Sequence, residues 1–182
     1  MIDSKTTPEL RLRPVADTDE YAALATPWCG DPEVLDLSEG GAAPYEEARV
    51  RRMFESTRKK GEVYLIEIRR DDGWLAIGDA SLLSDATPIV IGDERHRSQG
   101  IGSRALRLLV QRARELGRET VWVSGIVARN QRSLRMYRRA GFVECGRERD
   151  ERGEESVKMR LDLGRADEKN PTSPNDAPST VL

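Results

Sequence analysis

The sequence has one histidine and two cysteines in 182 residues, which restricts the metal and nucleophile chemistry open to it. Cys29 and Cys145 lie far apart in the chain and form no C-x-x-C pair. A structural zinc site needs closely spaced Cys and His ligands, so none is expected. His96 is the one imidazole, and no serine or cysteine motif surrounds it. Hydrolase chemistry with a histidine-activated nucleophile is therefore disfavoured.

Long apolar runs and an excess of one charge are also missing. No segment approaches the roughly 20 apolar residues of a membrane span. Charged Asp3, Lys5 and Glu9 stand where a signal peptide is apolar, so we expect a cytoplasmic protein. Lys and Arg number 30 against 32 Asp and Glu. This balance argues against a general nucleic-acid binder, which usually carries a basic excess.

The length suits one domain with a full hydrophobic core. After Gly164 the composition changes to Asp, Asn, Pro, Ser and Thr, with almost no large apolar residue. We therefore predict one domain over residues 1–164 and a disordered tail over residues 165–182.

Hydrophobic periodicity predicts alternating strands and helices, with period 2 for strands and 3.6 for helices. Residues 28–41 show no sustained period, so we expect an irregular or short helical segment that frames a substrate pocket. Two hairpins are expected among the strands, which indicates a mixed α/β fold. The expected strands cover residues 10–15, 62–69, 74–83, 88–92, 120–127, 142–149 and 156–163, and the expected helices follow Asp17 and cover residues 45–60, 101–116 and 133–140.

A glycine-containing turn lies between a buried strand and the long amphipathic helix. Backbone N–H groups at a helix N-terminus, together with the helix dipole, favour anions, and glycines let a ligand approach the backbone. The turn therefore predicts a pyrophosphate site. Its residues are Arg97, Ser98, Gln99, Gly100, Ile101, Gly102 and Ser103.

Two other phosphate-binding patterns fit this turn less well. The Walker pattern needs a lysine after the second glycine, and the turn has none. The dinucleotide pattern G-x-G-x-x-A is matched by letter at Gly100, Gly102 and Ala105. However, residues 121–127 offer no acid for the ribose, so a nicotinamide site is disfavoured.

Two motifs together give the chain a family resemblance. Arg97-x-x-Gly100-x-Gly102 is followed by Asn130-x-x-Ser133-x-x-x-Tyr137-x-x-x-Gly141-Phe142, each on the expected element. This pair resembles the GCN5-related N-acetyltransferases, and the resemblance covers about residues 9–163. Segments 10–14, 31–34 and 91–93 resemble the subgroup that acetylates ribosomal-protein N-termini and, in relatives, spermidine.

The resemblance implies an α/β fold with a central, mixed, mainly antiparallel sheet, splayed where the acetyl group enters. It implies acetyl-CoA as acetyl donor and no metal. The backbone of residues 99–103 would receive the pyrophosphate, and Ile91, Gly92 and Asp93 would pair with the pantetheine amides like an added strand. Arg97 would assist the phosphates or remain a solvated loop arginine, and Arg95, Arg104 and Arg107 would attract them or serve solubility.

Three residues of the second motif have both a structural and a functional interpretation. Asn130 either contacts the coenzyme or caps the second helix, and Ser133 follows on the same helix as a coenzyme contact. By periodicity Tyr137 is a core residue. The resemblance instead places its hydroxyl beside the coenzyme sulfur, where a phenol can protonate the departing thiolate as a general acid.

The general base is not identified by the motifs. Many relatives carry a glutamate at the start of the central strand, at a position that falls near Ala86 in this chain. Asp85, beside it, is our candidate base. Asp93, Glu94, a water chain and His96 remain alternatives, although His96 is expected to be exposed in the turn.

The reaction implied is direct acetyl transfer to a primary amine, either a protein N-terminus or a small molecule, in a ternary complex. The alternative is a non-catalytic acyl-CoA-binding module. Acceptor contacts are expected from residues 28–45 and 150–155, and relatives often form homodimers. A basic helix face suggests nucleic acid only remotely, since it is typical of a solvated helix; it comprises Arg129, Arg132, Arg135 and Arg139.

Overall fold

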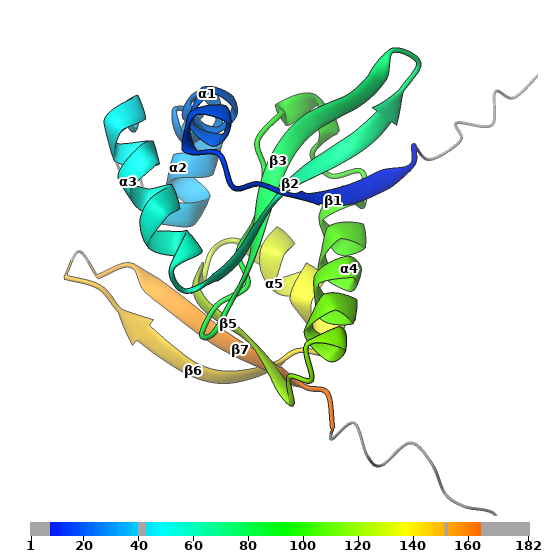
Figure 1. The fold of residues 1–182 in the computed structure, drawn as a ribbon. Coiled ribbons are helices and arrows are strands. Elements are labelled where there is room, and N and C mark those ends of the chain that lie inside the picture. Colours follow the sequence, from blue (N-terminus) through cyan, green and yellow to red (C-terminus); the bar gives the residue numbers. More distant parts are fainter. Residues whose placement is uncertain (1–7, 40–42, 152, 165–182) are drawn as a thin grey trace, which may run out of the picture.

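A computed structural model describes residues 8–39, 43–151 and 153–164. The predicted tail, residues 165–182, lies outside the described residues. Figure 1 shows the arrangement of the helices and strands. Along the chain they are β1 (Leu10–Pro14), α1 (Thr18–Cys29), α2 (Pro32–Glu39), α3 (Glu47–Arg58), β2 (Gly61–Arg70), β3 (Gly73–Leu83), β4 (Ile89–Ile91), the 3-10 helix η1 (Glu94–His96), α4 (Ile101–Glu115), β5 (Thr120–Val127), α5 (Gln131–Arg139), β6 (Val143–Arg149) and β7 (Glu155–Asp162).

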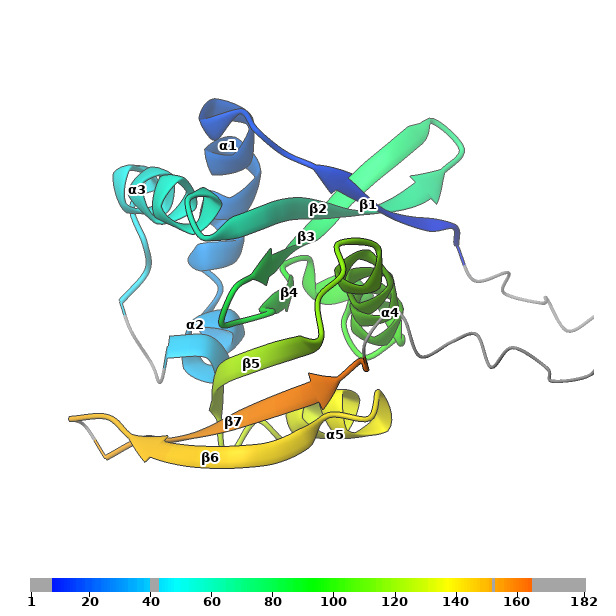
Figure 2. The same ribbon diagram turned by 60° about the horizontal axis from the view of Figure 1, so that its bottom comes forward.

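The strands form two antiparallel sheets. One has the order β1-β2-β3-β4 and the other the order β5-β7-β6. β4 and β5 are the facing edge strands, and they do not pair with each other. Figure 2 shows them diverging between the two sheets. The predicted mixed α/β fold with a splayed, mainly antiparallel sheet is confirmed.

The alternation of β2 explains how the first sheet is covered on both faces. Tyr64, Ile66 and Ile68 point to the main core, which α4 and α5 share with the second sheet. Val63 and Leu65 point to the opposite face and pack with α1 and α3. Because both faces are buried, the strand is apolar at successive positions rather than at every second one.

The predicted elements agree with the structure, with two refinements. The segment over residues 28–41 contains a helix, α2, and the chain in front of it is the end of α1. β2 begins at Gly61, one residue before the expected strand over residues 62–69. A Cβ at Gly61 would lie 2.3 Å from the Leu82 carbonyl oxygen, so the close approach of β2 and β3 requires glycine here.

Candidate active site

The glycine turn presents a row of free backbone N–H groups at the start of α4. Gly100 is the N-cap in the left-handed region, with φ of 78°, and Ser98 also has positive φ, at 59°. Within the described part of the chain, no N–H from residues 98–103 donates a hydrogen bond. No side chain caps the helix either. Free N–H groups at the positive end of a 15-residue helix can bind an anion.

The second feature is the open edge of β4. Ser81 N donates to Pro88 O at 3.0 Å, so the alternation of an antiparallel ladder turns the backbone of Val90 toward β3. The backbone groups of Ile89 and Ile91 then face the unpaired edge. An extended ligand amide chain can hydrogen-bond there as an added strand.

Arg97 holds the end of this strand rather than pointing at the helix N-terminus. Its guanidinium donates to Ile91 O at 3.0 Å and to Gly92 O at 2.8 Å. It also forms ion pairs with Asp31 and Glu33 at the start of α2, at 3.1 and 3.0 Å. The side chain is 8% exposed, so it is not the solvated loop arginine of the alternative interpretation. Each carbonyl oxygen retains a second lone pair for a ligand.

Asp93 and His96 are engaged with the η1 turn. Asp93 N donates to Ile77 O at 3.0 Å, and the Asp93 carboxylate caps η1 and binds the Arg95 guanidinium. These contacts lower the pKa of Asp93 to about 2. His96 Nδ1 lies 3.2 Å from Asp93 Oδ2, and the His96 side chain is 13% exposed, contrary to the expected exposure in the turn.

Tyr137 on α5 reaches the beginning of β4. Its hydroxyl donates to Thr87 O at 2.7 Å, and its ring meets Phe142 edge-on at 5.3 Å. The residue is 2% exposed, and burial raises its pKa above the ordinary value for tyrosine. Thr87 is fully buried, and its Oγ1 has no partner among the described residues. A buried hydroxyl without a partner is unusual, and it lies where a ligand at the β4 edge would end.

Asn130 caps α5. Its Oδ1 accepts a hydrogen bond from Ser133 N at 3.0 Å, and its Nδ2 donates to Leu37 O at 3.4 Å. The capping interpretation of Asn130 is therefore confirmed, and Ser133 is engaged through its backbone N–H. Coenzyme contacts by these two residues remain predictions.

The structure reveals a carboxylate that sequence reasoning missed. Asp79 lies on β3 opposite Val90, and Tyr21 on α1 donates to its Oδ2 at 3.1 Å. Burial raises the pKa of Asp79 to about 6, against an ordinary value of 3.8. The sequence signal was one acid within an apolar strand. Asp85, the predicted base, instead lies exposed in the loop between β3 and β4.

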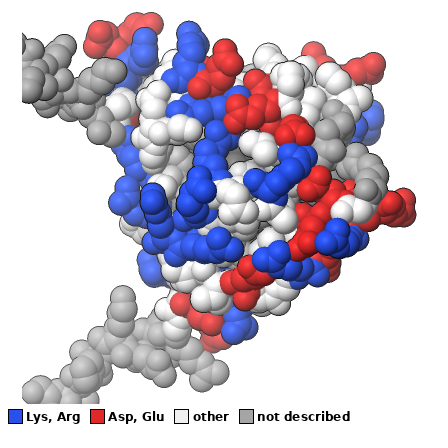
Figure 3. Space-filling model, turned by 180° about the vertical axis from the view of Figure 1, so that it is seen from behind, with Lys and Arg blue, Asp and Glu red and all other residues white. Residues whose placement is uncertain are grey.

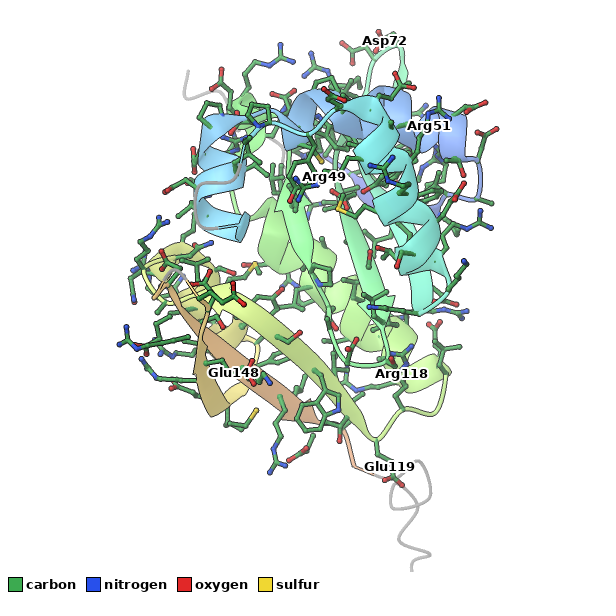
Figure 4. The ribbon with its side chains drawn as sticks, turned by 90° about the vertical axis from the view of Figure 1, so that its left-hand side faces the viewer. Arg49, Arg51, Asp72, Arg118, Glu119 and Glu148 are labelled. Carbon is green, nitrogen blue, oxygen red and sulfur yellow. The ribbon has the colours of Figure 1, made fainter. Side chains whose placement is uncertain are left out.

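The helices of the N-terminal part contact this region closely. The Trp28 indole at the end of α1 packs directly on Gly92, because a Cβ there would lie 2.0 Å from Trp28 Cγ. Figure 4 shows Arg49 of α3 between α2 and α3. Its guanidinium stacks on the Tyr45 ring at 3.5 Å. Trp28 on Gly92, and Asp31 and Glu33 on Arg97, bring the described start of the predicted acceptor segment to the end of β4, whereas residues 40–42 of that segment lie outside the described residues.

The predicted basic helix face is partly neutralised. Arg129 pairs with Asp36 and Glu154, and Arg132 pairs with Glu33 at 2.8 Å. Figure 3 shows Lys and Arg gathered on the back of the molecule, where α4 and α5 lie. Exposed arginines of these helices are Arg107, Arg114, Arg132, Arg135, Arg138 and Arg139. This positive surface adjoins the anion site and favours approach of a polyphosphate ligand.

The family model described as an acetyltransferase (GNAT) domain matches residues 9–143. This chain belongs to that family. Family membership makes it an N-acetyltransferase with acetyl-CoA as co-substrate. A comparison with curated protein sequences found no match.

Solved structures share the fold. A domain from Methanocaldococcus jannaschii superposes with a TM-score of 0.73 at 15% identity, covering 86% of this chain and all, 100%, of that one. Aminoglycoside acetyltransferase AAC(6')-Ib, solved with coenzyme A, superposes with a TM-score of 0.68 at 16% identity, covering 85% of this chain and 95% of that one. Ribosomal-protein-alanine N-acetyltransferase from Brucella melitensis superposes with a TM-score of 0.62 at 20% identity, covering 85% of this chain and 99% of that one.

The part of the chain that the structure describes has no helix with the length and apolar character of a membrane span.

Proposed function

We propose that the enzyme transfers acetyl from acetyl-CoA to a primary amine by direct attack in a ternary complex, with Tyr137 as general acid. The buried Tyr137 hydroxyl at the start of β4 carries this proposal. The hydroxyl contacts Thr87, just before the first residue of β4, whereas Ile91 at the other end of the strand leads toward the N-terminus of α4. A ligand with its pyrophosphate at residues 98–103 and its arm along β4 would bring its thioester to the hydroxyl.

The residues present fit the coenzyme. The N–H groups of residues 98–103 would hold the pyrophosphate, and the open edge of β4 would pair with the pantetheine amides. Arg97 would act by holding Ile91 and Gly92 in place. Asn130 and Ser133 would line the coenzyme arm at the start of α5.

Tyr137 suits the acid role because its raised pKa keeps the phenol protonated at neutral pH. The hydroxyl hydrogen can turn from Thr87 O toward a thiolate, since the O–H bond rotates freely. Donation of this proton as the C–S bond breaks would make the thiol, rather than the thiolate, the leaving group. The attacking amine must be neutral, so a base is also required when the acceptor is charged.

The acceptor class is a primary amine of a protein N-terminus or a small molecule. Structural neighbours include an aminoglycoside acetyltransferase and a ribosomal-protein-alanine acetyltransferase. Contacts would come from residues 28–45 and 150–155, of which residues 40–42 and 152 lie outside the described residues. Cytoplasmic location and homodimerisation stay predictions.

The test is thiol release from acetyl-CoA with N-terminal peptides, polyamines, amino acids and aminoglycosides as acceptors. We expect turnover with one acceptor class, and a fall in kcat of about 100-fold in Tyr137→Phe, within the range for general acid catalysis. Coenzyme A affinity should be nearly unchanged in this variant, because the ring remains.

Tyr64→Phe is the matched control for this experiment. Tyr64 is also a buried tyrosine whose hydroxyl donates to a protein group, Glu62, but it lies on β2 away from the β4 edge. Its variant should keep full turnover. Full turnover in Tyr137→Phe would remove the acid role, and coenzyme binding without turnover on any amine would favour the binding-module alternative.

A further inference from the structure

Two polar groups approach β4 from opposite faces. Tyr137 reaches it from the core shared by α4 and α5. Asp79 lies on the face covered by α1, where Tyr21 donates to its carboxylate and stacks on Phe54 at 4.2 Å. The register pairs Asp79 with Val90, the central residue of β4. The strand that would hold the thioester therefore has a phenol on one side and a carboxylate on the other.

The spacing of the strands sets the reach of Asp79. A ligand paired with the open edge of β4 would lie two strand spacings, about 10 Å, from the backbone of β3. Thr87, where the thioester would lie, is three residues or about 10 Å from Val90 along the strand, so a chain of bridging waters over β4 would connect the aspartate side chain with the acceptor amine. Water chains can carry protons in general base catalysis.

The carboxyl group of Asp79 is surrounded by protein, but the residue is not completely buried. Protein surrounds the carboxyl group closely enough to desolvate it, yet the residue retains partly exposed surface. A purely structural buried carboxylate is normally paired with a cation. Among the described residues, no Lys or Arg forms an ion pair with Asp79, and Tyr21 is its side-chain donor.

We propose that Asp79 is the general base that removes the proton from the acceptor amine. This inference rests on the proposed function and supplies the base that the reaction needs. One proton of the ammonium passes through the bridging waters to the Asp79 carboxylate. The neutral nitrogen then forms the C–N bond to the acetyl carbonyl carbon, and the C–S bond breaks.

The remaining proton transfers involve Tyr137 and solvent. Tyr137 gives its proton to the departing sulfur, and the second proton released by the nitrogen as the amide forms restores the phenol. Asp79 returns its proton to solvent. The net products are the acetylated amine, the free thiol and one proton.

The groups that face Asp79 set its titration. α1 presents Tyr21 and Cys29, whereas the facing residues of β2 and β4 are Leu65 and Val90. Charged groups on β2 and α3 have other partners. Glu67 on β2 is bound by Arg11 and Arg13, and Arg49 on α3 stacks on Tyr45.

The hydrogen bond from Tyr21 favours the charged form of Asp79 and lowers its pKa, against the larger effect of burial. Tyr21 is therefore a positioning residue for the base. Its loss should raise the pKa of Asp79 without removing the carboxylate.

The experiment measures kcat/KM from pH 5 to 9 for the wild type, Asp79→Asn, Tyr21→Phe, Asp85→Asn and Asp72→Asn. We expect the wild type to lose activity as pH falls through about 6. Asp79→Asn should lose this acid limb and about 100-fold of kcat at pH 8. Tyr21→Phe should shift the limb to higher pH. Asp72, exposed in the β2–β3 turn, is the control and should match the wild type.

Two further readouts separate a base from a structural residue. Coenzyme A affinity, measured by calorimetry, should be equal in the wild type and Asp79→Asn. The activity lost in Asp79→Asn should shrink for acceptor analogues whose amine is less basic, because they need less deprotonation. An equal loss for all analogues would overturn the proposal.

Retention of the acid limb in Asp79→Asn also overturns the assignment, and its disappearance in Asp85→Asn instead would transfer the role to Asp85. These results leave the proposed function standing. Absence of wild-type turnover on every amine overturns the proposed function and the base together.

Discussion

The side chains of Arg97 and Asn130, one from each motif, make hydrogen bonds with the backbone of the protein. Arg97 binds the carbonyls of Ile91 and Gly92 and the acids at the start of α2, and Asn130 caps α5. Both side chains hold backbone that lies beside the proposed path of the coenzyme. A motif residue can therefore be required for coenzyme binding through the strand or helix that it fixes, without touching the coenzyme.

Gly92 lies in direct contact with the Trp28 ring. A Cβ there would overlap the Trp28 ring, so Gly92→Ala should displace the indole and the end of β4. Overpacking typically costs 1–3 kcal/mol, so we expect a loss of about that size in the free energy of unfolding. Coenzyme A affinity should fall as well, measured by calorimetry. Gly146→Ala is the control, because its nearest atoms would lie at 3.8 Å; equal behaviour of the two variants would contradict this view.

At the scale of elements, α4 gives a matched pair of glycines. Gly100 precedes the helix with φ of 78° and Gly117 follows it with φ of 68°, and added Cβ atoms would meet nothing within 4 Å at either site. Alanine in this conformation costs about 1–2 kcal/mol, so both variants should lose similar stability. Only Gly100→Ala should weaken coenzyme A binding, since only its Cβ enters the anion site. Similar affinities for the two variants would argue against a phosphate site at this turn.

Most elements were predictable because their signals are local. Hydrophobic periodicity predicted the helix over residues 101–116, and α4 covers Ile101–Glu115. The glycine turn and Tyr137 were accessible through motifs. Asp79 was not, because its role depends on Tyr21, 58 residues away in sequence, and on the register with Val90. A single acid in a strand otherwise indicates an exposed position, and α1 covers this one.

The candidate site depends on how the two sheets are arranged, because it lies at the edge of β4 where they separate. One edge of β4 has no partner strand among the described residues, although an open strand edge is normally a liability. The two sheets remain joined through the core that α4 and α5 share. A buried, uncompensated carboxylate in the same region is a second local cost. Both features lower the stability of the free enzyme in a region that a ligand would complete.

The pH dependence of unfolding should reveal the cost of Asp79. Its folded pKa of about 6 exceeds the ordinary 3.8, so its stabilising contribution is present below pH 4 and is lost as pH rises through 6. Asp93, with its pKa lowered to about 2, acts oppositely and loses its contribution only as pH falls toward 2. At 1.36 kcal/mol per unit, the shift of Asp79 corresponds to up to about 3 kcal/mol.

Asp79→Asn should therefore be more stable than the wild type at pH 8, by up to about 3 kcal/mol, and the difference should shrink at pH 4.5. The amide oxygen still accepts the Tyr21 hydrogen bond, so packing is retained. Urea unfolding at both pH values measures the difference, with Asp72→Asn as the exposed control. A variant less stable than the wild type at pH 8 would mean that the carboxylate stabilises the fold. A variant that is more stable and less active would show that this charge is retained for catalysis at the expense of stability.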